Sequence, residues 1–91
     1  MYSEVIQHYG LENQTDMLME ECAELIQAAN KMKRYPEDHE ARRNLIEEIV
    51  DVEIMIAQMK IGYKITKEEI TSLRMQKDNR LFKRLWEEKA E

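Results

Sequence analysis

The sequence contains very few of the residues that cross-link, bend or interrupt a chain. Its 91 residues include one cysteine, one proline and two glycines. The single cysteine, Cys22, excludes an internal disulfide framework and suits a reducing compartment. Because Gly10 and Gly62 are the only glycines, neither a Walker loop nor a Rossmann fingerprint can form. Any phosphate group would have to be held by a metal ion and by cationic side chains.

The sequence also lacks long apolar runs and an excess of positive charge. No apolar run approaches the ~20 residues that a membrane-spanning helix requires, and no charged segment followed by an apolar one opens the chain. The net charge of −5 disfavours general nucleic-acid binding, which requires a basic surface. We therefore expect a cytoplasmic protein that has neither a membrane nor a nucleic acid as its partner.

The residues that are abundant favour helices. Glu, Lys, Leu, Ile and Met dominate, and β-branched runs are few, which is typical of an all-α chain. We predict a single domain over residues 1–91, a helical bundle of about four helices with a short first helix. A chain of this length buries little of its own surface, so we expect the core to be completed in a homodimer or homotetramer.

Glycine and capping residues predict the limits of the first two helices. Val5, Ile6 and Tyr9 have helical spacing, and Gly10 follows them where a helix C-terminus is expected. Asn13 or Thr15 then caps a second helix, which continues to about residue 35.

The only proline, Pro36, marks the main break between residues 35 and 40. A third helix follows and ends at about residue 62. It is apolar on nearly every side, which is typical of a buried helix. Glu53 lies among these apolar residues and either joins an acidic site or pairs with a base such as Lys60. Thr66 and Glu69 form a capping-box signature that starts the last helix.

Two acidic clusters lie inside the second and third of these segments. The first, EECAE, begins at Glu20. At about 100° per residue, Glu21 falls within an apolar face and Glu24 lies at the edge of that face. The apolar face consists of Met17, Leu18, Leu25, Ala28, Ala29 and Met32.

The second cluster, EEIVD, ends at Asp51. Glu48 falls between Met55 and Met59 on the helical wheel, and Asp51 lies about 60° further round. The spacing of Glu48 and Asp51 places both side chains on one helical face, one turn apart.

Carboxylates in an apolar interface require compensation, because moving an ion into low dielectric costs several kcal/mol. Several carboxylates together also repel one another, which raises their pKa values until protons or a cation occupy the site. Oxygen ligands without His or Cys favour Mg²⁺ or Mn²⁺ over zinc. If the two helices pack antiparallel, Glu21, Glu24, Glu48 and Asp51 are expected to converge on one or two such ions.

The string EECAELIQA, followed after a spacer by EEIVDVE, resembles the MazG-like family of all-α nucleoside triphosphate pyrophosphohydrolases. The pattern of that family is Glu-Glu-x-x-Glu, a spacer, and Glu-x-x-Asp, and the resemblance covers residues 13–58. It implies Mg²⁺-dependent cleavage of a ribo- or deoxyribonucleoside triphosphate between the α and β phosphates, which gives the monophosphate and pyrophosphate. It also implies that Glu21, Glu24, Glu48 and Asp51 are metal ligands. Glu20 would be a further carboxylate near the metal or the attacking water, and Glu20 or Glu24 could accept the proton of that water.

Two groups of cations are candidates for binding the triphosphate. Lys31, Lys33 and Arg34 close the second helix, where positive charge is expected for dipole reasons alone; the alternative is contact with the phosphates. Lys77 and Arg80 belong to a basic set on the last helix that is either a solvated face or a supplement to the metal charge. The resemblance favours the second role for these two residues.

Two other functions fit the same pattern. Phosphoribosyl-ATP pyrophosphohydrolase shares the acidic helices of this superfamily and cleaves a similar bond. A non-catalytic helical dimerisation or regulatory module would instead pair the buried carboxylates with Lys or Arg. A ferritin-like di-iron bundle requires Glu-x-x-His motifs, and neither His8 nor His39 supplies one.

Overall fold

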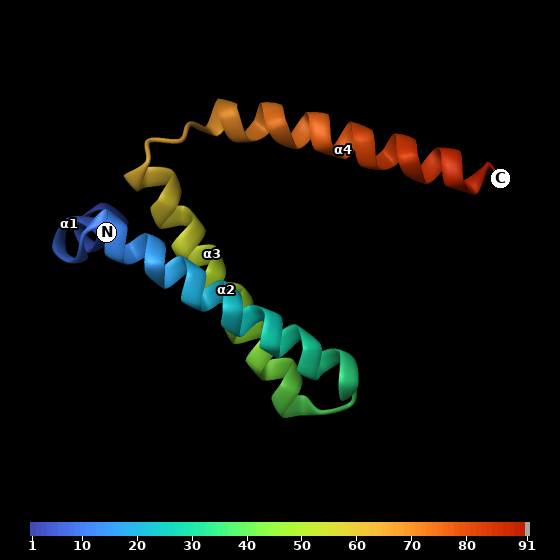
Figure 1. Ribbon diagram of the computed structural model, residues 1–91, viewed down its shortest axis with the longest axis horizontal. Coiled ribbons are helices and arrows are strands. Elements are labelled where there is room, and N and C mark those ends of the chain that lie inside the picture. Colours follow the sequence, from blue (N-terminus) through green and yellow to red (C-terminus); the bar gives the residue numbers. More distant parts are fainter. Residues whose placement is uncertain (91) are drawn as a thin grey trace.

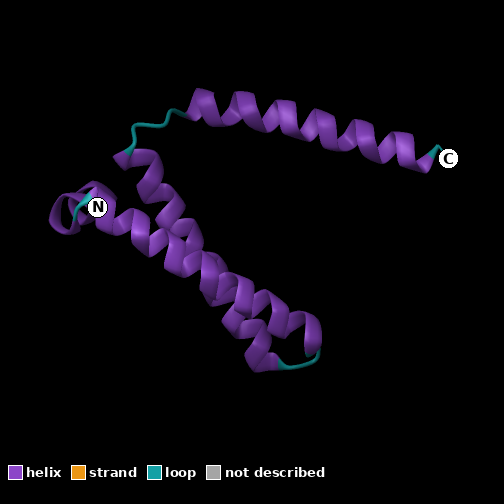
Figure 2. Cartoon of the chain, viewed as in Figure 1, coloured by secondary structure: helices purple, strands orange, loops and turns teal. Residues whose placement is uncertain are grey.

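The computed structural model describes residues 1–90, which form four α-helices joined by short connections (Figure 1). The helices are α1 (Tyr2–Tyr9), α2 (Leu11–Arg34), α3 (His39–Gly62) and α4 (Lys67–Lys89). Figure 2 shows no strand in this part of the chain. The predicted all-α chain of four helices with a short first helix is confirmed. Within residues 1–90, no helix has the length and apolar character needed to cross a membrane.

The predicted starts of the third and fourth helices are confirmed by their caps. The turn that contains Pro36 leads to Asp38, whose carboxylate accepts a hydrogen bond of 2.9 Å from the Glu40 amide at the start of α3. The side chain of Thr66 accepts a hydrogen bond of 3.1 Å from the Glu69 amide, and the Glu69 carboxylate accepts one of 3.1 Å from the Thr66 amide. Each cap satisfies backbone donors that a helix start otherwise leaves without partners.

The predicted start of the second helix is wrong. α2 begins at Leu11, so Asn13 and Thr15 lie inside the helix instead of capping it. Gly10 has a φ of 90° and serves as the end of α1 and the start of α2, because glycine adopts this conformation without steric cost. The Thr15 hydroxyl donates to the Leu11 carbonyl at 2.9 Å, a bond made within the helix.

The core lies between α2 and α3, which run antiparallel as a long hairpin (Figure 1). Its register is fixed by a buried hydrogen bond of 2.8 Å from Gln14 Nε2 to Gln58 Oε1. The buried apolar residues are small or flexible: Ala28, Ala41, Val52, Met55 and Met59. Ala29, which the wheel places on the apolar face of α2, is exposed.

Much apolar surface stays outside this hairpin. α4 packs against none of the other described helices and extends away from them (Figure 1). The radius of gyration is 17.0 Å, against about 12 Å for a compact chain of this length. The accessible surface is 7815 Å², against about 5,600 Å² for a compact monomer of this mass. One copy of the chain is therefore an extended unit with a small core.

Candidate metal centre

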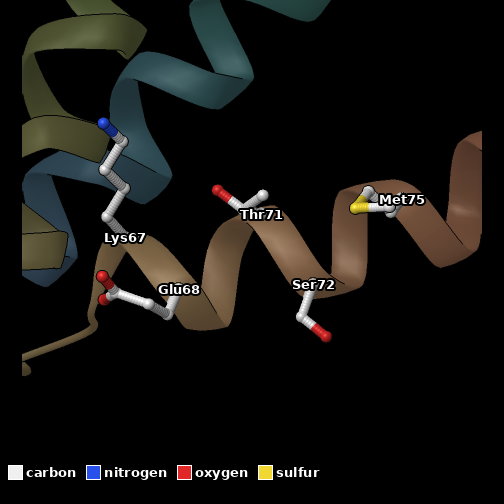
Figure 3. Close-up of a pocket in the computed structure, with 5 residues that line it drawn as sticks. All are labelled: Lys67, Glu68, Thr71, Ser72 and Met75. Carbon is white, nitrogen blue, oxygen red and sulfur yellow. The ribbon is translucent and has the colours of Figure 1, made fainter.

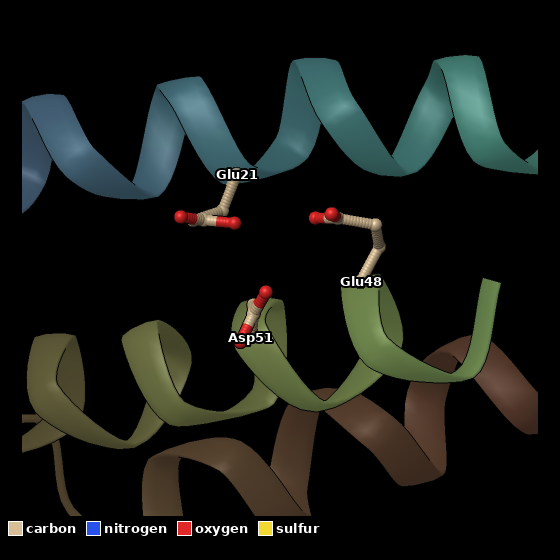
Figure 4. A group of neighbouring side chains, drawn as sticks. All are labelled: Glu21, Glu48 and Asp51. Atoms are coloured by element: carbon tan, nitrogen blue, oxygen red, sulfur yellow. The ribbon is translucent and has the colours of Figure 1, made fainter. Parts of the chain in front are cut away.

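Three carboxylates face one another across the α2–α3 interface (Figure 4). Glu21 comes from α2, and Glu48 and Asp51 come from successive turns of α3. One oxygen atom from each residue lies within 4.8 Å of the other two. The antiparallel hairpin thus brings together acidic residues that are far apart in the sequence.

This group of carboxylates is partly buried and has no compensating cation among residues 1–90. Glu21, Glu48 and Asp51 are each half-buried, and the Oε2 atoms of Glu21 and Glu48 are buried without a hydrogen-bond partner in the described chain. The ion pairs found within residues 1–90 join Arg43 to Glu47 and the N-terminus to Glu4, outside the group. Buried acceptors of this kind are costly unless something binds them.

The pKa of Glu21 is raised from 4.5 to about 7, first by burial and then by the negative charges of Glu24, Asp51 and Glu48. Burial also raises the pKa of Glu48, and the charges of Glu24 and Asp51 add to that effect. Both causes disfavour the ionised form. A proton or a cation is therefore bound favourably here at neutral pH.

The metal-free protein is expected to lose stability as the pH rises through about 7. Glu21 holds its proton more tightly in the folded state, with a pKa of about 7, than at its ordinary value of 4.5. Its contribution to the free energy of unfolding is complete below pH 4.5 and is lost as the pH rises through 7. The measurement is urea denaturation of wild type and Glu21→Gln, both with EDTA, between about pH 5 and pH 8.5. A stability difference between the two proteins that stays constant over this range would contradict the expectation.

The donor set suits a hard divalent cation. All the ligand atoms offered by Glu21, Glu48 and Asp51 are carboxylate oxygens, the donors that Mg²⁺ and Mn²⁺ prefer. Two oxygens bound to one Mg²⁺ are at most about 4.2 Å apart. Small rotations of these side chains would close the 4.8 Å group to that size. These three residues fit an ion of this class.

Glu24 lies beside the group but is exposed. Its charge contributes to the raised pKa values of Glu21 and Glu48, and it lines a cleft of ≈ 410 Å³ next to Glu48. Lys31 lines the same cleft and is the one predicted phosphate-binding residue placed beside the acidic group. Glu20 is exposed on α2 and does not belong to the converging set.

Two further residues that line the cleft were not predicted from the sequence. Gln27 and Asn44 line the cleft together with Ala28 and the residues just named. Gln27 lies three residues after Glu24, and Asn44 lies four residues before Glu48, so each shares a helical face with an acidic residue. This spacing was the available signal, and both amides can hydrogen-bond a polar ligand.

The other predicted phosphate-binding residues lie outside this cleft. Lys33 and Arg34 are exposed at the end of α2, and the Arg34 guanidinium lies 5.5 Å from the centre of the Tyr35 ring. Lys77 and Arg80 line a basic hollow of ≈ 210 Å³ on α4, together with Arg84. Because α4 packs against no other described helix, one chain does not bring these two residues to the acidic group.

A second hollow on α4, of ≈ 500 Å³, lies along the first turns of this helix (Figure 3). It is lined by Lys67, Glu68, Thr71, Ser72 and Met75, which all come from one exposed helix. No cluster of titratable groups converges in it, and it offers no catalytic arrangement among the described residues.

Glu53 does not join the acidic site. It is exposed on α3 and does not belong to the converging group, and it forms no ion pair with Lys60 or another residue within the described chain. A single copy of residues 1–90 therefore shows neither of the two predicted alternatives, in which Glu53 joins the acidic site or pairs with a base such as Lys60.

Comparison of this chain with known protein families, with curated proteins and with solved structures found no match. Its function is therefore inferred from the residues of the site and their geometry.

Proposed function

We propose that this protein is a divalent-metal-dependent nucleotide pyrophosphohydrolase. The observation that carries the proposal is the convergence of Glu21, Glu48 and Asp51, with two buried oxygens that have no hydrogen-bond partner in residues 1–90. A half-buried group of carboxylates that contains buried, unpartnered oxygens costs stability in the absence of a cation. Such a group is readily explained when the protein binds a metal for its function.

The MazG-like resemblance supports the same assignment through the same acidic residues. The three converging residues match three positions of the motif, and Glu24 matches a fourth. Bound by these residues, Mg²⁺ would neutralise phosphate charge and lower the pKa of the attacking water. The reaction in this proposal is in-line attack of water on the α-phosphorus, which releases pyrophosphate.

The neighbouring side chains have roles in this proposal that follow from their positions. Glu24 is exposed at the edge of the group, where it can accept the proton of the attacking water, and Glu20 is the alternative. Lys31 supplies positive charge in the cleft, where it would meet a phosphate oxygen. Gln27 and Asn44 offer amide groups that can orient the substrate.

Pyrophosphate release from a nucleotide panel tests this function. The panel contains the common NTPs and dNTPs together with phosphoribosyl-ATP, each with Mg²⁺ or Mn²⁺. We expect release of pyrophosphate from at least one member and loss of that release with EDTA, because the carboxylates alone supply no positive charge to the phosphates. The nucleotide product, analysed by mass, identifies the bond that is cleaved.

The panel also separates the alternatives. Turnover of phosphoribosyl-ATP alone would identify the enzyme of histidine biosynthesis. No turnover of any member, from a protein whose helix content and mass are normal, would contradict the proposal and favour the non-catalytic helical module.

A further inference from the structure

A buried pair of amide side chains lies in the same interface as the acidic group of Glu21, Glu48 and Asp51. Gln14 of α2 and Gln58 of α3 are only 7% and 4% exposed, and Gln14 Nε2 donates a hydrogen bond of 2.8 Å to Gln58 Oε1. Among residues 1–90, no other buried hydrogen bond between side chains joins the two helices. Such a pair requires an explanation, because apolar side chains of similar volume would fill the same space without burying polar groups.

The amide pair and the acidic group belong to the same register of the two helices. Gln14 precedes Glu21 by seven residues on α2, and Gln58 follows Asp51 by seven residues on α3. Seven residues are about two turns and about 10 Å along a helix axis. Because the two helices run antiparallel, the register that brings the two amides together also places Glu21 opposite Asp51 (Figure 4).

The apolar residues of this interface define its register only weakly. They are Ala28, Ala41, Val52, Met55 and Met59. Alanine is small, and methionine has a flexible side chain that adapts to more than one packing. The turn at residues 35–38 connects the helices at one end of the hairpin, and the amide pair lies towards the other end, with the acidic group between them. The amide pair is therefore the buried contact that sets the register far from the turn.

A change of register would disrupt the amide pair and the acidic group together. Moving one helix by a single turn displaces its side chains by about 5.4 Å, which exceeds the 4.8 Å that separates the carboxylate oxygens at most. The move would also leave the buried amides of Gln14 and Gln58 without partners, which penalises the alternative register. A hydrogen bond of 2.7 Å between the Thr15 and Tyr63 hydroxyls lies at the same end, but it is exposed and competes with water.

We propose that Gln14 and Gln58 are positioning residues of the acidic group, and that their hydrogen bond holds α2 and α3 in the register in which Glu21 faces Asp51. The inference rests on the proposed function where it concerns metal binding. In the metal-free protein the carboxylates repel one another across the interface, and the amide pair opposes the displacement that this repulsion favours. A divalent ion then meets ligands that are already in place, so its binding requires little rearrangement of the helices.

The test replaces both amides with methionine, which has a side chain of similar length and volume. Gln14→Met/Gln58→Met leaves no buried amide without a partner, so we expect its melting temperature in EDTA to stay close to that of wild type. Its dissociation constant for Mn²⁺ is expected to rise by about tenfold or more, as when residues that orient metal ligands are lost. The measurement is the electron paramagnetic resonance signal of free Mn²⁺ during a titration.

A merely structural role for the amides would change the melting temperature and leave the Mn²⁺ affinity of the folded protein unchanged. Gln7→Met/Gln76→Met makes the same exchange at two exposed positions, so it has the same composition as the amide variant. This matched control is expected to bind Mn²⁺ as wild type does.

A second measurement requires no metal. In EDTA at about pH 8.5, Glu21→Gln relieves the repulsion and is expected to raise the melting temperature in the wild-type background. In the Gln14→Met/Gln58→Met background the helices can move apart, so we expect the same substitution to raise it by about half as much or less. This comparison tests the amide pair even where wild type binds no Mn²⁺ or releases no pyrophosphate, results that contradict the proposed function instead.

Gln14→Met alone serves where the double variant fails to fold. In this variant Gln58 Nε2 can still donate to Met55 Sδ, and only the Gln58 carbonyl oxygen loses its partner. The same weakening of Mn²⁺ binding and the same smaller effect of Glu21→Gln are expected. A folded amide variant that keeps the measured Mn²⁺ affinity of wild type would overturn the proposal, and so would a stabilisation by Glu21→Gln that is equal in both backgrounds.

Discussion

Replacing Glu21 with Gln is expected to abolish pyrophosphate release while the helices stay intact. Glu21 is the residue that α2 contributes to the converging group, and its pKa is the one raised to about 7. Mutation of a residue that hydrogen-bonds a metal ligand typically costs about 10- to 100-fold in metal affinity or activity. Loss of a metal ligand itself should therefore lower activity by more than about 100-fold. The measurements are pyrophosphate release with saturating Mg²⁺ and circular dichroism of the same samples.

The stability of the metal-free variant distinguishes lost chemistry from lost folding. Gln removes a half-buried charge that repels Asp51 and Glu48, so Glu21→Gln is expected to unfold at a higher temperature than wild type in EDTA at pH values above about 7. Glu37→Gln changes an exposed residue in the α2–α3 turn and is expected to leave both activity and stability unchanged. Full activity in Glu21→Gln would remove this residue from the proposed site.

Adding Mg²⁺ or Mn²⁺ is expected to raise the melting temperature of the wild-type protein by about 10 °C or more. A ligand that binds only the folded state at about 100 times its dissociation constant stabilises by about 2.7 kcal/mol. One kcal/mol shifts the melting temperature of a domain of this size by about 4–8 °C. The measurement is a thermal melt at fixed protein concentration with increasing metal chloride, compared with NaCl at equal ionic strength.

The same titration on Glu48→Gln provides the control for this effect. Glu48 has a buried Oε2 atom without a hydrogen-bond partner in residues 1–90, so its loss should remove most of the metal-induced shift. Because protons compete with the metal for Glu21, the shift is expected to be larger at about pH 8 than at about pH 5.5. A wild-type melting temperature that divalent metal leaves unchanged would support the non-catalytic helical module instead.

The helices were predictable where a local residue fixes a boundary. Pro36, Asp38 and the Thr66–Glu69 capping box act within a few residues, so their effects can be seen in the sequence. The start of α2 was not predictable in the same way. Gly10 is the single residue between α1 and α2. The sequence alone does not show that one residue is enough to connect the two helices.

The acidic group was predictable because charge among apolar residues is conspicuous on a helical wheel. The sequence indicated Glu21, Glu48 and Asp51, which the structure brings together. The contributions of Gln27 and Asn44 depend on how the two helices cross, and helical periodicity does not determine that crossing. The sequence also did not predict that α4 lies away from the acidic group. A basic helix face has the same sequence pattern whether it contacts a ligand or solvent.

The freestanding α4 has a consequence for how the chain becomes ordered. Most of the stability of a helix in a protein comes from tertiary packing, and α4 has no such packing within the described chain. In α4 the capping box supplies local support at one end, while Leu81, Phe82 and Trp86 remain more than half exposed. Any surface that bound these side chains would therefore raise the helicity of α4 by mass action.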